Sequence, residues 1–489
     1  MKCFRGIQMV IVWTILIVIV SLVVVVLART LMLKPTAAQN AVVQLDESER
    51  AVLYGDKLAK MVQVETISEP RQANRSKFLA FHKVLEQEFP NVHKTCEKTV
   101  LNGSLLLKWT GTGEKEPIMF MSHHDVVEAG GEWEHEPFSG DIDEKGRVWG
   151  RGCVDTKGSL CCIFGAIEEL IEEGYKPPMD VYIASSCTEE VSGDGGPAIA
   201  QYLKDKGVKL DLILDEGGMI LKAPIAGVNG IYAMVGVVEK GYGDVKFIAH
   251  GRGGHASAPG KNTPLVRLGK FMTAVEKKNP FKSQLTPTVR EMFSRMAPNM
   301  IFPLKMVMAN LWLFEGLLAK LLPSINAAAG AMIRTTLAFT KAKGSDGLNV
   351  LPQTAYVTGN MRFIHHQPTD ESIKLISDIA KEYDLETEVL YKDYPCPIVD
   401  FKGRQFKLIE AVMEKVYPGV GTCPYVMTGG TDCKFYNEVC DNAIRLAPIF
   451  IDEQQYASIH GLNENIYRGA LPKAVDFYKE VVILQSQAN

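Results

Sequence analysis

The chain has 489 residues, of which 46% are hydrophobic and 22% charged, an ordinary composition for a folded protein of two or three domains. Its formal net charge of −4 gives no basis for a nucleic-acid-binding surface. The ten cysteines form no C-x-x-C pair, so they predict neither a zinc ribbon nor a thioredoxin-like redox site, and they leave the cellular compartment open.

An apolar run near the N-terminus predicts a membrane-targeting segment. Residues 9–28 are apolar except for Thr14 and Ser21. About twenty residues are what a membrane-spanning helix requires, whereas the apolar core of a signal peptide usually has about 7–15. Basic residues flank both ends, so the charges do not fix the orientation. We predict a signal anchor in residues 1–34 with the large domain outside the cytosol, or a secreted protein if the segment is cleaved.

The next part of the chain alternates predicted helices and strands. A polar tether occupies residues 35–48. Apolar spacing then predicts helices over residues 49–62, 75–88, 160–173 and 197–206, and strands over 100–109, 117–121, 180–186 and 210–214. Such alternation is typical of an α/β fold with a mostly parallel sheet covered by helices. We therefore predict that residues 35–236 form the first part of a large α/β domain.

The pattern changes after residue 236, which predicts an inserted domain over residues 237–368. Residues 237–250 resemble two strands with a turn at 241–243, and further elements are predicted over 265–277, 349–363 and 370–383. Residues 306–322 form one apolar helical segment. Because it contains Asn310, Glu315 and Lys320, we interpret it as a buried or partner-facing helix, not as a second membrane span. The large domain resumes over residues 369–489.

Acidic residues and one histidine follow the predicted strands of the large domain. Ligands of open α/β sheets bind at the carboxyl ends of strands. Side chains alternate along a strand, so His123 and Asp125 point the same way and His124 points oppositely. Acids gathered at one edge repel one another unless a cation lies among them, and Arg151 and Lys157 are the only basic candidates in these loops. A metal site is therefore predicted from this set: His123, Asp125, Asp155, Glu189, Glu190 and Asp215.

The ordered motifs of the chain resemble a known family. They are SHHDVV, GRGCVDTKGS, TEEVSG, LDEGG, GGHASAP, NMRF, GGTD and IHGLNE, and they extend over residues 45–480. This series is similar to the co-catalytic zinc metallopeptidase superfamily of aminoacylase and carboxypeptidase S, especially the branch of carboxypeptidase S and secreted N-fatty-acyl-amino-acid synthase/hydrolases. The resemblance implies a dizinc peptidase domain interrupted by a smaller ferredoxin-like α/β lid and dimerisation domain, and a homodimer.

The resemblance implies two zinc ions per chain, held by five ligands. Asp155 matches the carboxylate that bridges both metals. Asp215 and Glu216 are adjacent hard oxygen ligands at a strand end, and their spacing does not separate them; we favour Asp215. The implied ligands are His123, Asp155, Glu190, Asp215 and His460.

The resemblance also implies roles for residues beside the metals. Glu189 matches the general base, and because Glu189 and Glu190 are adjacent, one can bind metal while the other faces the attacking water. Asp125 matches the residue that orients His123. His255 matches a histidine that reaches the active site of the partner subunit and stabilises the oxyanion.

Three further positions are implied to bind the free carboxylate of the substrate. Arg362 resembles the arginine that holds this group, a task suited to a guanidinium fork. Gly430 and Thr431 would add backbone and hydroxyl donors, whereas we interpret Asp432 as structural.

These features predict a zinc-dependent amidohydrolase that cleaves, and by reversal forms, the amide bond of N-acyl amino acids, including N-fatty-acyl amino acids. The apolar segment 285–345 would suit a long acyl chain. The alternative is a carboxypeptidase that releases C-terminal amino acids from peptides. An inactive homologue that acts as a binding or dimerisation module is disfavoured by the complete set of candidate residues.

Overall fold

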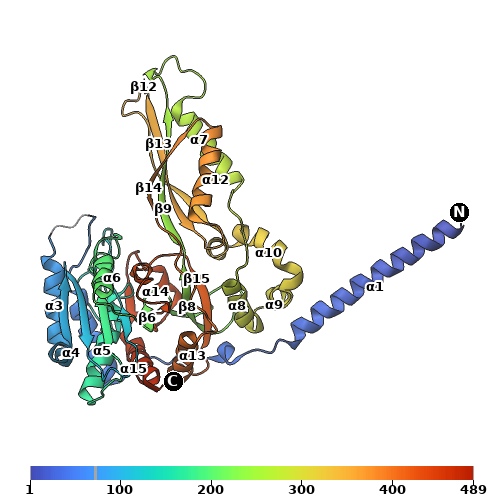
Figure 1. Cartoon of the computed structure of the whole chain (residues 1–489). Helices are drawn as coiled ribbons and strands as arrows, with labels where there is room; N and C mark the ends of the chain where they lie inside the picture. Colours follow the sequence, from blue (N-terminus) through green and yellow to red (C-terminus); the bar gives the residue numbers. More distant parts are fainter. Residues whose placement is uncertain (1, 71–73, 488–489) are drawn as a thin grey trace.

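The computed structural model describes residues 2–70 and 74–487. Figure 1 shows a large α/β body, a slender second domain that rises from it, and the N-terminal helix α1 (Lys2–Met32) projecting to one side. The mixed α/β architecture confirms the predicted fold class in outline.

The body contains a ten-stranded sheet in the order β1-β2-β5-β3-β6-β16-β8-β7-β17, with β15 paired to β8. Pairs β3–β5, β3–β6 and β6–β16 are parallel, but β1–β2, β2–β5 and β7–β8 are antiparallel. Pairs β8–β15 and β7–β17 are also parallel, whereas β8–β16 is antiparallel, so the sheet is mixed and a mostly parallel sheet is not confirmed. Its strands are β1 (Glu97–Leu101), β2 (Ser104–Trp109), β3 (Ile118–Met121), β5 (Val181–Ser185), β6 (Leu212–Asp215), β7 (Ile220–Lys222), β8 (Ile231–Glu239), β15 (Gly421–Met427), β16 (Ala443–Arg445) and β17 (Phe450–Ile451).

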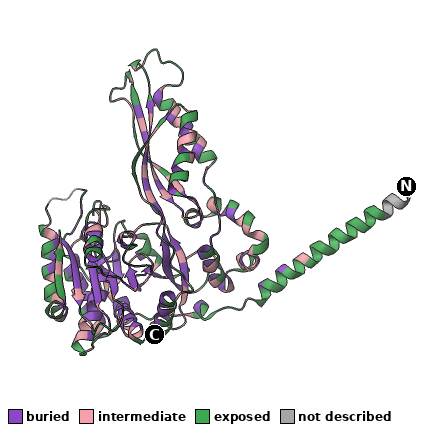
Figure 2. Cartoon of the chain, in the orientation of Figure 1, coloured by how far each residue is buried: buried purple, intermediate pink, exposed green. Residues whose placement is uncertain are grey.

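Both faces of this sheet are buried, as the continuous apolar strands require. Ile118 and Phe120 of β3 contribute to one hydrophobic cluster, whereas Met119 and Met121 contribute to the cluster on the opposite face. Figure 2 shows the strands of the body almost entirely in the colour of buried residues. The helices of the body are α2 (Glu49–Val62), α3 (Ser76–Glu88), α4 (Pro90–Thr95), α5 (Lys157–Glu172), α6 (Gly195–Asp205), α13 (Arg404–Val416), α14 (Glu453–Ala457) and α15 (Leu471–Gln487).

The two domains are joined by one nearly continuous extended run. β8 belongs to the large sheet and ends at Glu239. After a single intervening residue, β9 (Gly241–His250) begins in the small sheet. The predicted hairpin over residues 237–250 is therefore wrong, because the apparent turn is where the chain passes between sheets. We place the first domain boundary at Lys240.

The second domain has the β-α-β-β-α-β element order of ferredoxin-like folds. Its four strands are antiparallel in the order β11-β13-β9-β14, and α7 and α12 complete its separate hydrophobic core. β14 also pairs with β9, so this sheet includes residues beyond 368, the predicted end of the inserted domain. Its elements are β9, α7 (Pro264–Lys277), β11 (Thr336–Lys343), β13 (Thr354–Phe363), α12 (Thr369–Glu382) and β14 (Glu386–Lys392), with β10 (Gly254–His255) and β12 (Val350–Leu351) paired at its tip.

A helical segment between α7 and β11 packs on the body rather than on the small sheet. It comprises α8 (Pro287–Met296), α9 (Phe302–Ala309), α10 (Leu311–Ile325) and α11 (Ala327–Ala331), and its buried side chains join the main hydrophobic cluster. The single helix predicted over residues 306–322 is wrong, because the chain bends by 113° between α9 and α10. Asn310 occupies this break and is fully buried.

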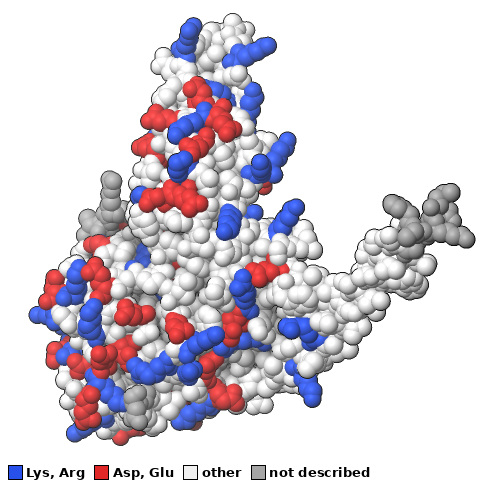
Figure 3. All heavy atoms as spheres, turned by 45° about the vertical axis from the view of Figure 1, so that its right-hand side comes forward, with Lys and Arg blue, Asp and Glu red and all other residues white. Residues whose placement is uncertain are grey.

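Helix α1 is long and apolar enough to cross a membrane. This property is compatible with a signal anchor or with a signal peptide. Its apolar side chains are exposed along most of its length. Figure 3 shows it as a largely uncharged rod, with Lys and Arg side chains where it joins the body.

Candidate functional site

The candidate site lies at one edge of the large sheet. β5, β3 and β6 are parallel neighbours, so their carboxyl ends meet at the same edge. His123 and Asp125 follow β3, Glu189 and Glu190 follow β5, and Asp215 ends β6. Asp155 lies two residues before the start of α5, and His460 comes from the turn after α14. The predicted convergence of these segments is what the strand order produces.

Two groups of metal-ligating side chains share Asp155. One comprises His123, Asp155 and Glu216, the other Asp155, Glu190 and His460; within each group the ligand atoms lie within 4.8 Å of one another. The two carboxylate oxygens of Asp155 face different histidines, with Oδ1 3.0 Å from His123 Nε2 and Oδ2 3.1 Å from His460 Nε2. Such a carboxylate can bridge two cations.

The protonation of His123 fits a metal ligand. Its Nδ1 lies 2.9 Å from the main-chain carbonyl oxygen of Asp125, which can only accept, so Nδ1 carries the proton. When the ring is neutral, the lone pair of Nε2 therefore faces the Asp155 carboxylate. A cation between these two groups would be bound by both. Burial lowers the pKa of His123, but the carboxylates of Asp155 and Glu189 outweigh it and raise the pKa well above its ordinary value. Without a cation, Nε2 therefore holds a second proton in the position that a metal ion would take.

The carboxyl groups of the site also fit a bound cation. Burial, together with the charges of neighbouring acids, raises the pKa of Glu190 and raises that of Glu216 well above its ordinary value. The buried Glu190 Oε1 has no hydrogen-bond partner among the residues that the structure describes. Buried carboxylates of this kind are normally paired or coordinate metals. His460 completes the group 3.0 Å from Glu190 Oε2 and is half exposed, which leaves this side of the site open.

The two adjacent acids at the end of β6, Asp215 and Glu216, have different surroundings. Asp215 Oδ1 accepts a hydrogen bond from the Glu216 N–H (2.9 Å), and Oδ2 accepts one from the Cys433 N–H (3.2 Å). Glu216 is directed at the Asp155 group, and neither ligand group found among the described residues includes Asp215. The choice of Asp215 therefore stays a prediction, and Glu216 is the alternative to which these contacts point.

Asp125 positions the two glutamates more directly than it positions His123. Its carboxylate accepts hydrogen bonds from the N–H groups of Glu189 and Glu190, both at 3.1 Å, and from the Ser68 hydroxyl at 2.7 Å. The distance from Asp125 Oδ1 to His123 Nδ1 is 3.6 Å, too long for a hydrogen bond. The predicted orientation of His123 is therefore provided by the Asp125 carbonyl.

His124 points away from the site, as its place in the strand predicts. It is fully buried, stacks on Phe81 with ring centroids 5.2 Å apart, and its Nδ1 lies 2.8 Å from the Ser185 hydroxyl. Asp432 instead lies beside the site, in a small cavity with Glu189 and Glu216, and burial raises its pKa to about 7.

Glu464, to which the sequence analysis gave no role, holds the Asp155 loop in place. It is fully buried and accepts hydrogen bonds from the N–H groups of Val154 and Asp155 at 2.8 and 3.1 Å. Its ion-pair partner Arg151 (2.8 Å) also donates to the Gly461 carbonyl. The pairing of β4 (Arg147–Trp149) with β18 (Asn465–Tyr467) brings these segments together. Two features of the sequence could have indicated this role. Glu464 is the acid of the IHGLNE motif, and Arg151 had no assigned partner.

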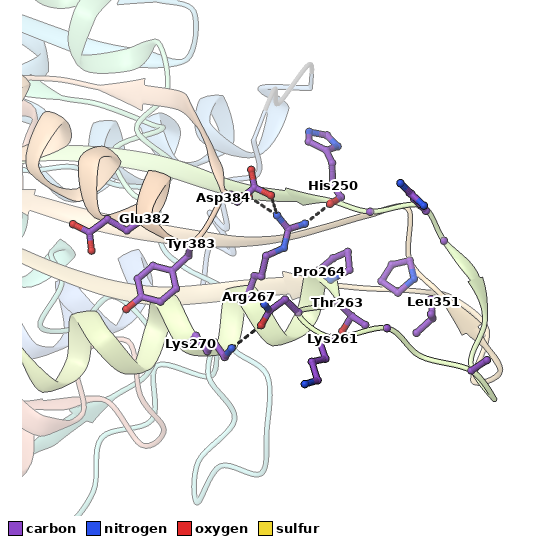
Figure 4. Close-up of a pocket in the computed structure, with 17 residues that line it drawn as sticks. His250, Lys261, Thr263, Pro264, Arg267, Lys270, Leu351, Glu382, Tyr383 and Asp384 are labelled. Carbon is purple, nitrogen blue, oxygen red and sulfur yellow. Dashed lines mark hydrogen bonds and ion pairs between the residues drawn. The ribbon is translucent and has the colours of Figure 1, made fainter.

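His255 is not part of this site within one chain. It lies on β10 at the tip of the second domain, is exposed, and forms a hydrogen bond with Ser257 through Nδ1. The same loop borders a pocket of about 770 Å³ in this domain (Figure 4). There Arg267 reaches between the His250 carbonyl and the Asp384 carboxylate. This pocket is separate from the carboxylate cluster.

The candidate carboxylate-binding residues occupy different surroundings. The Thr431 N–H and hydroxyl both donate to the buried carboxylate of Glu239, at 3.1 and 2.6 Å, and that carboxylate also pairs with Arg445 at 2.6 Å. Hydrogen bonds to a charged group contribute about 1.5–3 kcal/mol each, so Thr431 is not free to bind a substrate. These contacts do not support the role predicted for Thr431, whereas the adjacent Gly430 is partly exposed.

Arg362 lies near the domain junction. It is the penultimate residue of β13, opposite Tyr242 of β9, and its guanidinium lies 4.6 Å from the centroid of the Tyr242 ring. Its Nε donates to the Asn360 side chain at 3.3 Å. These contacts orient the guanidinium but do not join it to the carboxylate cluster.

Comparison with protein families identifies the class of enzyme. Residues 119–483 match the model of peptidase family M20/M25/M40. The N-fatty-acyl-amino acid synthase/hydrolase PM20D1 of Homo sapiens is 31% identical over 90% of this chain and 89% of its own length. Carboxypeptidase S of Saccharomyces cerevisiae is 26% identical over 88% and 83%, respectively. The resemblance of the motifs to this superfamily and branch is confirmed.

Solved structures share the fold at low sequence identity. An M20 family metallo-carboxypeptidase from Sulfolobus solfataricus aligns with a TM-score of 0.65 and 17% identity over 90% of this chain and all of its own. Human carnosine dipeptidase 1 aligns with the same TM-score and 13% identity, over 90% of this chain and 97% of its own.

Proposed function

The chain belongs to peptidase family M20/M25/M40, and from this membership we propose that it is a dizinc amidohydrolase acting on N-acyl amino acids, including N-fatty-acyl amino acids. The observation that carries the proposal is the pair of ligand groups joined through Asp155, with Glu189 beside them. We assign His123, Asp155 and Glu216 to one zinc ion and Asp155, Glu190 and His460 to the other.

The donor set suits zinc, which binds imidazole nitrogens and carboxylate oxygens. Bound zinc would supply Lewis acidity that polarises the scissile carbonyl and lowers the pKa of the attacking water. Glu189 would accept the proton of that water and deliver it to the leaving nitrogen. Its carboxylate lies 3.9 Å from His123 Nε2, and burial raises its pKa well above its ordinary value, as proton transfer near neutrality requires. Asp125 would hold Glu189 and Glu190 in position through their N–H groups.

The acyl-amino-acid substrate is supported by the relatives with N-fatty-acyl-amino acid synthase/hydrolase names, which align over most of this chain. Cleavage would release a fatty acid and an amino acid, and the same groups could catalyse the reverse condensation. Relatives named carboxypeptidase S or carboxypeptidase S-like support the second candidate, a carboxypeptidase. In either case Arg362, with the backbone at Gly430, would bind the free carboxylate after movement of the second domain.

We further propose that α1 anchors the protein in a membrane with the catalytic domain on the luminal or extracellular side, or directs secretion if it is cleaved. A homodimer through the second domain would bring His255 of each chain to the site of its partner. The exposed position of His255 at the tip of that domain supports this arrangement.

A substrate comparison tests the proposed function. We expect the purified full chain to hydrolyse N-oleoyl-phenylalanine faster than N-blocked dipeptides, since its relatives of this length include N-fatty-acyl-amino acid hydrolases. A chelator should abolish both activities, and added zinc should restore them. Preference for the dipeptides would favour the carboxypeptidase, and activity that survives verified metal removal would contradict both readings.

A mixing experiment tests the role of His255. Glu189→Gln and His255→Ala chains should each have low activity, but their heterodimer should recover up to about one wild-type site, because one site would contain intact Glu189 and the partner's intact His255. Mixed dimers are isolated with two affinity tags and assayed for hydrolysis. Ser257→Ala, which removes only the neighbour of His255, is the matched control and should remain active. No recovery in a verified heterodimer would remove His255 from the site.

A further inference from the structure

Helices α9 and α10 lie at one end of the membrane-competent helix. The apolar run 9–28 would extend about 30 Å as a helix, the thickness of the hydrocarbon core of a bilayer. Its C-terminal end contacts the break between α9 and α10: the Asn310 side chain donates to the Val26 carbonyl at 3.2 Å and to the Thr30 hydroxyl at 3.3 Å. Arg29 Nε donates to the Ala309 carbonyl at 3.2 Å. These contacts fix α9 and α10 beside the C-terminal end of the apolar run.

One face of α10 is buried against the body and the other is exposed and apolar. Ala319 and Leu322 belong to the main hydrophobic cluster. On the outer side, Leu317 is 56% exposed, Leu321 43% and Ile325 74%. Trp312, also 56% exposed, lies at the N-terminal end of α10 beside Asn310 and not on this face. Phe302 at the start of α9 is also half exposed. Monomeric soluble proteins rarely expose large apolar side chains together in this way, and such faces are typical of surfaces that contact a protein or a membrane.

We propose that the α9–α10 pair is a second membrane contact, which lies in the interface of the bilayer beside α1 with the outer face of α10 against lipid. The level of Asn310 relative to α1 places this face at the boundary between headgroups and acyl chains. Trp312 fits that boundary, because its ring is exposed while its indole N–H reaches the Asn310 side-chain oxygen at 3.4 Å.

The charges around the pair agree with this placement. Lys305 of α9 donates to the Leu33 carbonyl just beyond α1, and Arg29 and Lys34 flank the same point. Figure 3 shows basic side chains where α1 joins the body. Cations at this level can contact lipid phosphates while the apolar face enters the bilayer. The body would therefore contact the membrane surface through α9 and α10, in addition to its attachment through α1.

Tryptophan quenching by brominated lipid tests the proposal. The full chain carrying Trp13→Phe, which removes the tryptophan of the span, is reconstituted in phosphatidylcholine vesicles brominated at shallow acyl positions. We expect clear quenching of fluorescence that is lost by at least half when Trp312→Phe is added. Trp133→Phe in the same background, which changes a tryptophan of the catalytic domain, is the matched control and should leave the quenching unchanged.

Two outcomes would overturn the proposal. Quenching that is unaffected by Trp312→Phe would show that α10 does not contact lipid. Disulfide-linked dimers of a Leu321→Cys chain in the same vesicles, together with absent quenching, would show that a second copy covers this face. Neither result depends on which substrate the enzyme hydrolyses.

Discussion

Glu189→Gln is expected to lower kcat for amide hydrolysis by about 10²–10⁴-fold, the usual contribution of a general base. Glutamine preserves the size of the side chain but cannot accept the proton of the attacking water. The Glu189 N–H still donates to Asp125, so the backbone of the glutamate pair should not move. The measurement is kcat on an N-acyl amino acid, with the metal content of the same sample determined by elemental analysis.

The decisive control is the metal content. Glu189 belongs to neither ligand group found in the described part of the chain, so the variant should keep its full complement of zinc. Glu190→Gln is the matched comparison and should lose both zinc and activity, because Glu190 lies 3.0 Å from His460 in the second group. A Glu189 variant that retained wild-type kcat would exclude it as the base.

Glu216→Ala should remove one of the two zinc ions and reduce metal affinity by roughly 10²-fold or more, beyond the 10–100-fold typical of residues that only support a ligand. The reason is that the Glu216 side chain joins His123 and Asp155, whereas the Asp215 carboxylate is occupied by two backbone N–H groups. Zinc bound per chain after dialysis, and zinc affinity by competition with a chromophoric chelator, are the measurements.

Asp215→Asn distinguishes the two adjacent acids. Its amide group would face a backbone N–H in place of an acceptor, so stability should fall by about 1–3 kcal/mol. Zinc stoichiometry should nevertheless be retained. Loss of zinc in Asp215→Asn together with retention in Glu216→Ala would reverse the assignment.

The sequence predicted the α/β body and the βαβ-type alternation because apolar periodicity records which faces are buried. Prediction from the sequence failed where contacts with distant parts of the chain decide the local structure. Residues 237–250 have the pattern of two strands around a glycine-rich turn, yet they pass from one sheet to another through Lys240. Asn310 sits within an apolar helical pattern, and only its hydrogen bonds to α1 show why the helix breaks there.

The sequence predicted those residues of the candidate site that follow the ends of predicted strands. His123, Asp155, Glu190 and His460 are brought together by the order of the strands and loops. The choice between Asp215 and Glu216 depends on which backbone N–H groups surround the end of β6, and spacing holds no such information. Likewise, nothing in the pattern around Thr431 indicates that the distant Glu239 and Arg445 consume its donors.

The junction of the two domains bears on how the chain folds. β8 and β15 are parallel neighbours, yet the whole second domain lies between them in sequence. The two chain segments that cross the junction run together: the Asp393 N–H donates to the Tyr242 carbonyl at 2.8 Å, and Lys392 pairs with Gly243. Once β9 and β14 have paired, the loop left to close between β8 and β15 is about sixfold shorter, which lowers its entropic cost by roughly 1.6 kcal/mol. Pairing of β9 with β14 therefore lowers the entropic cost of bringing β8 and β15 together in the catalytic sheet.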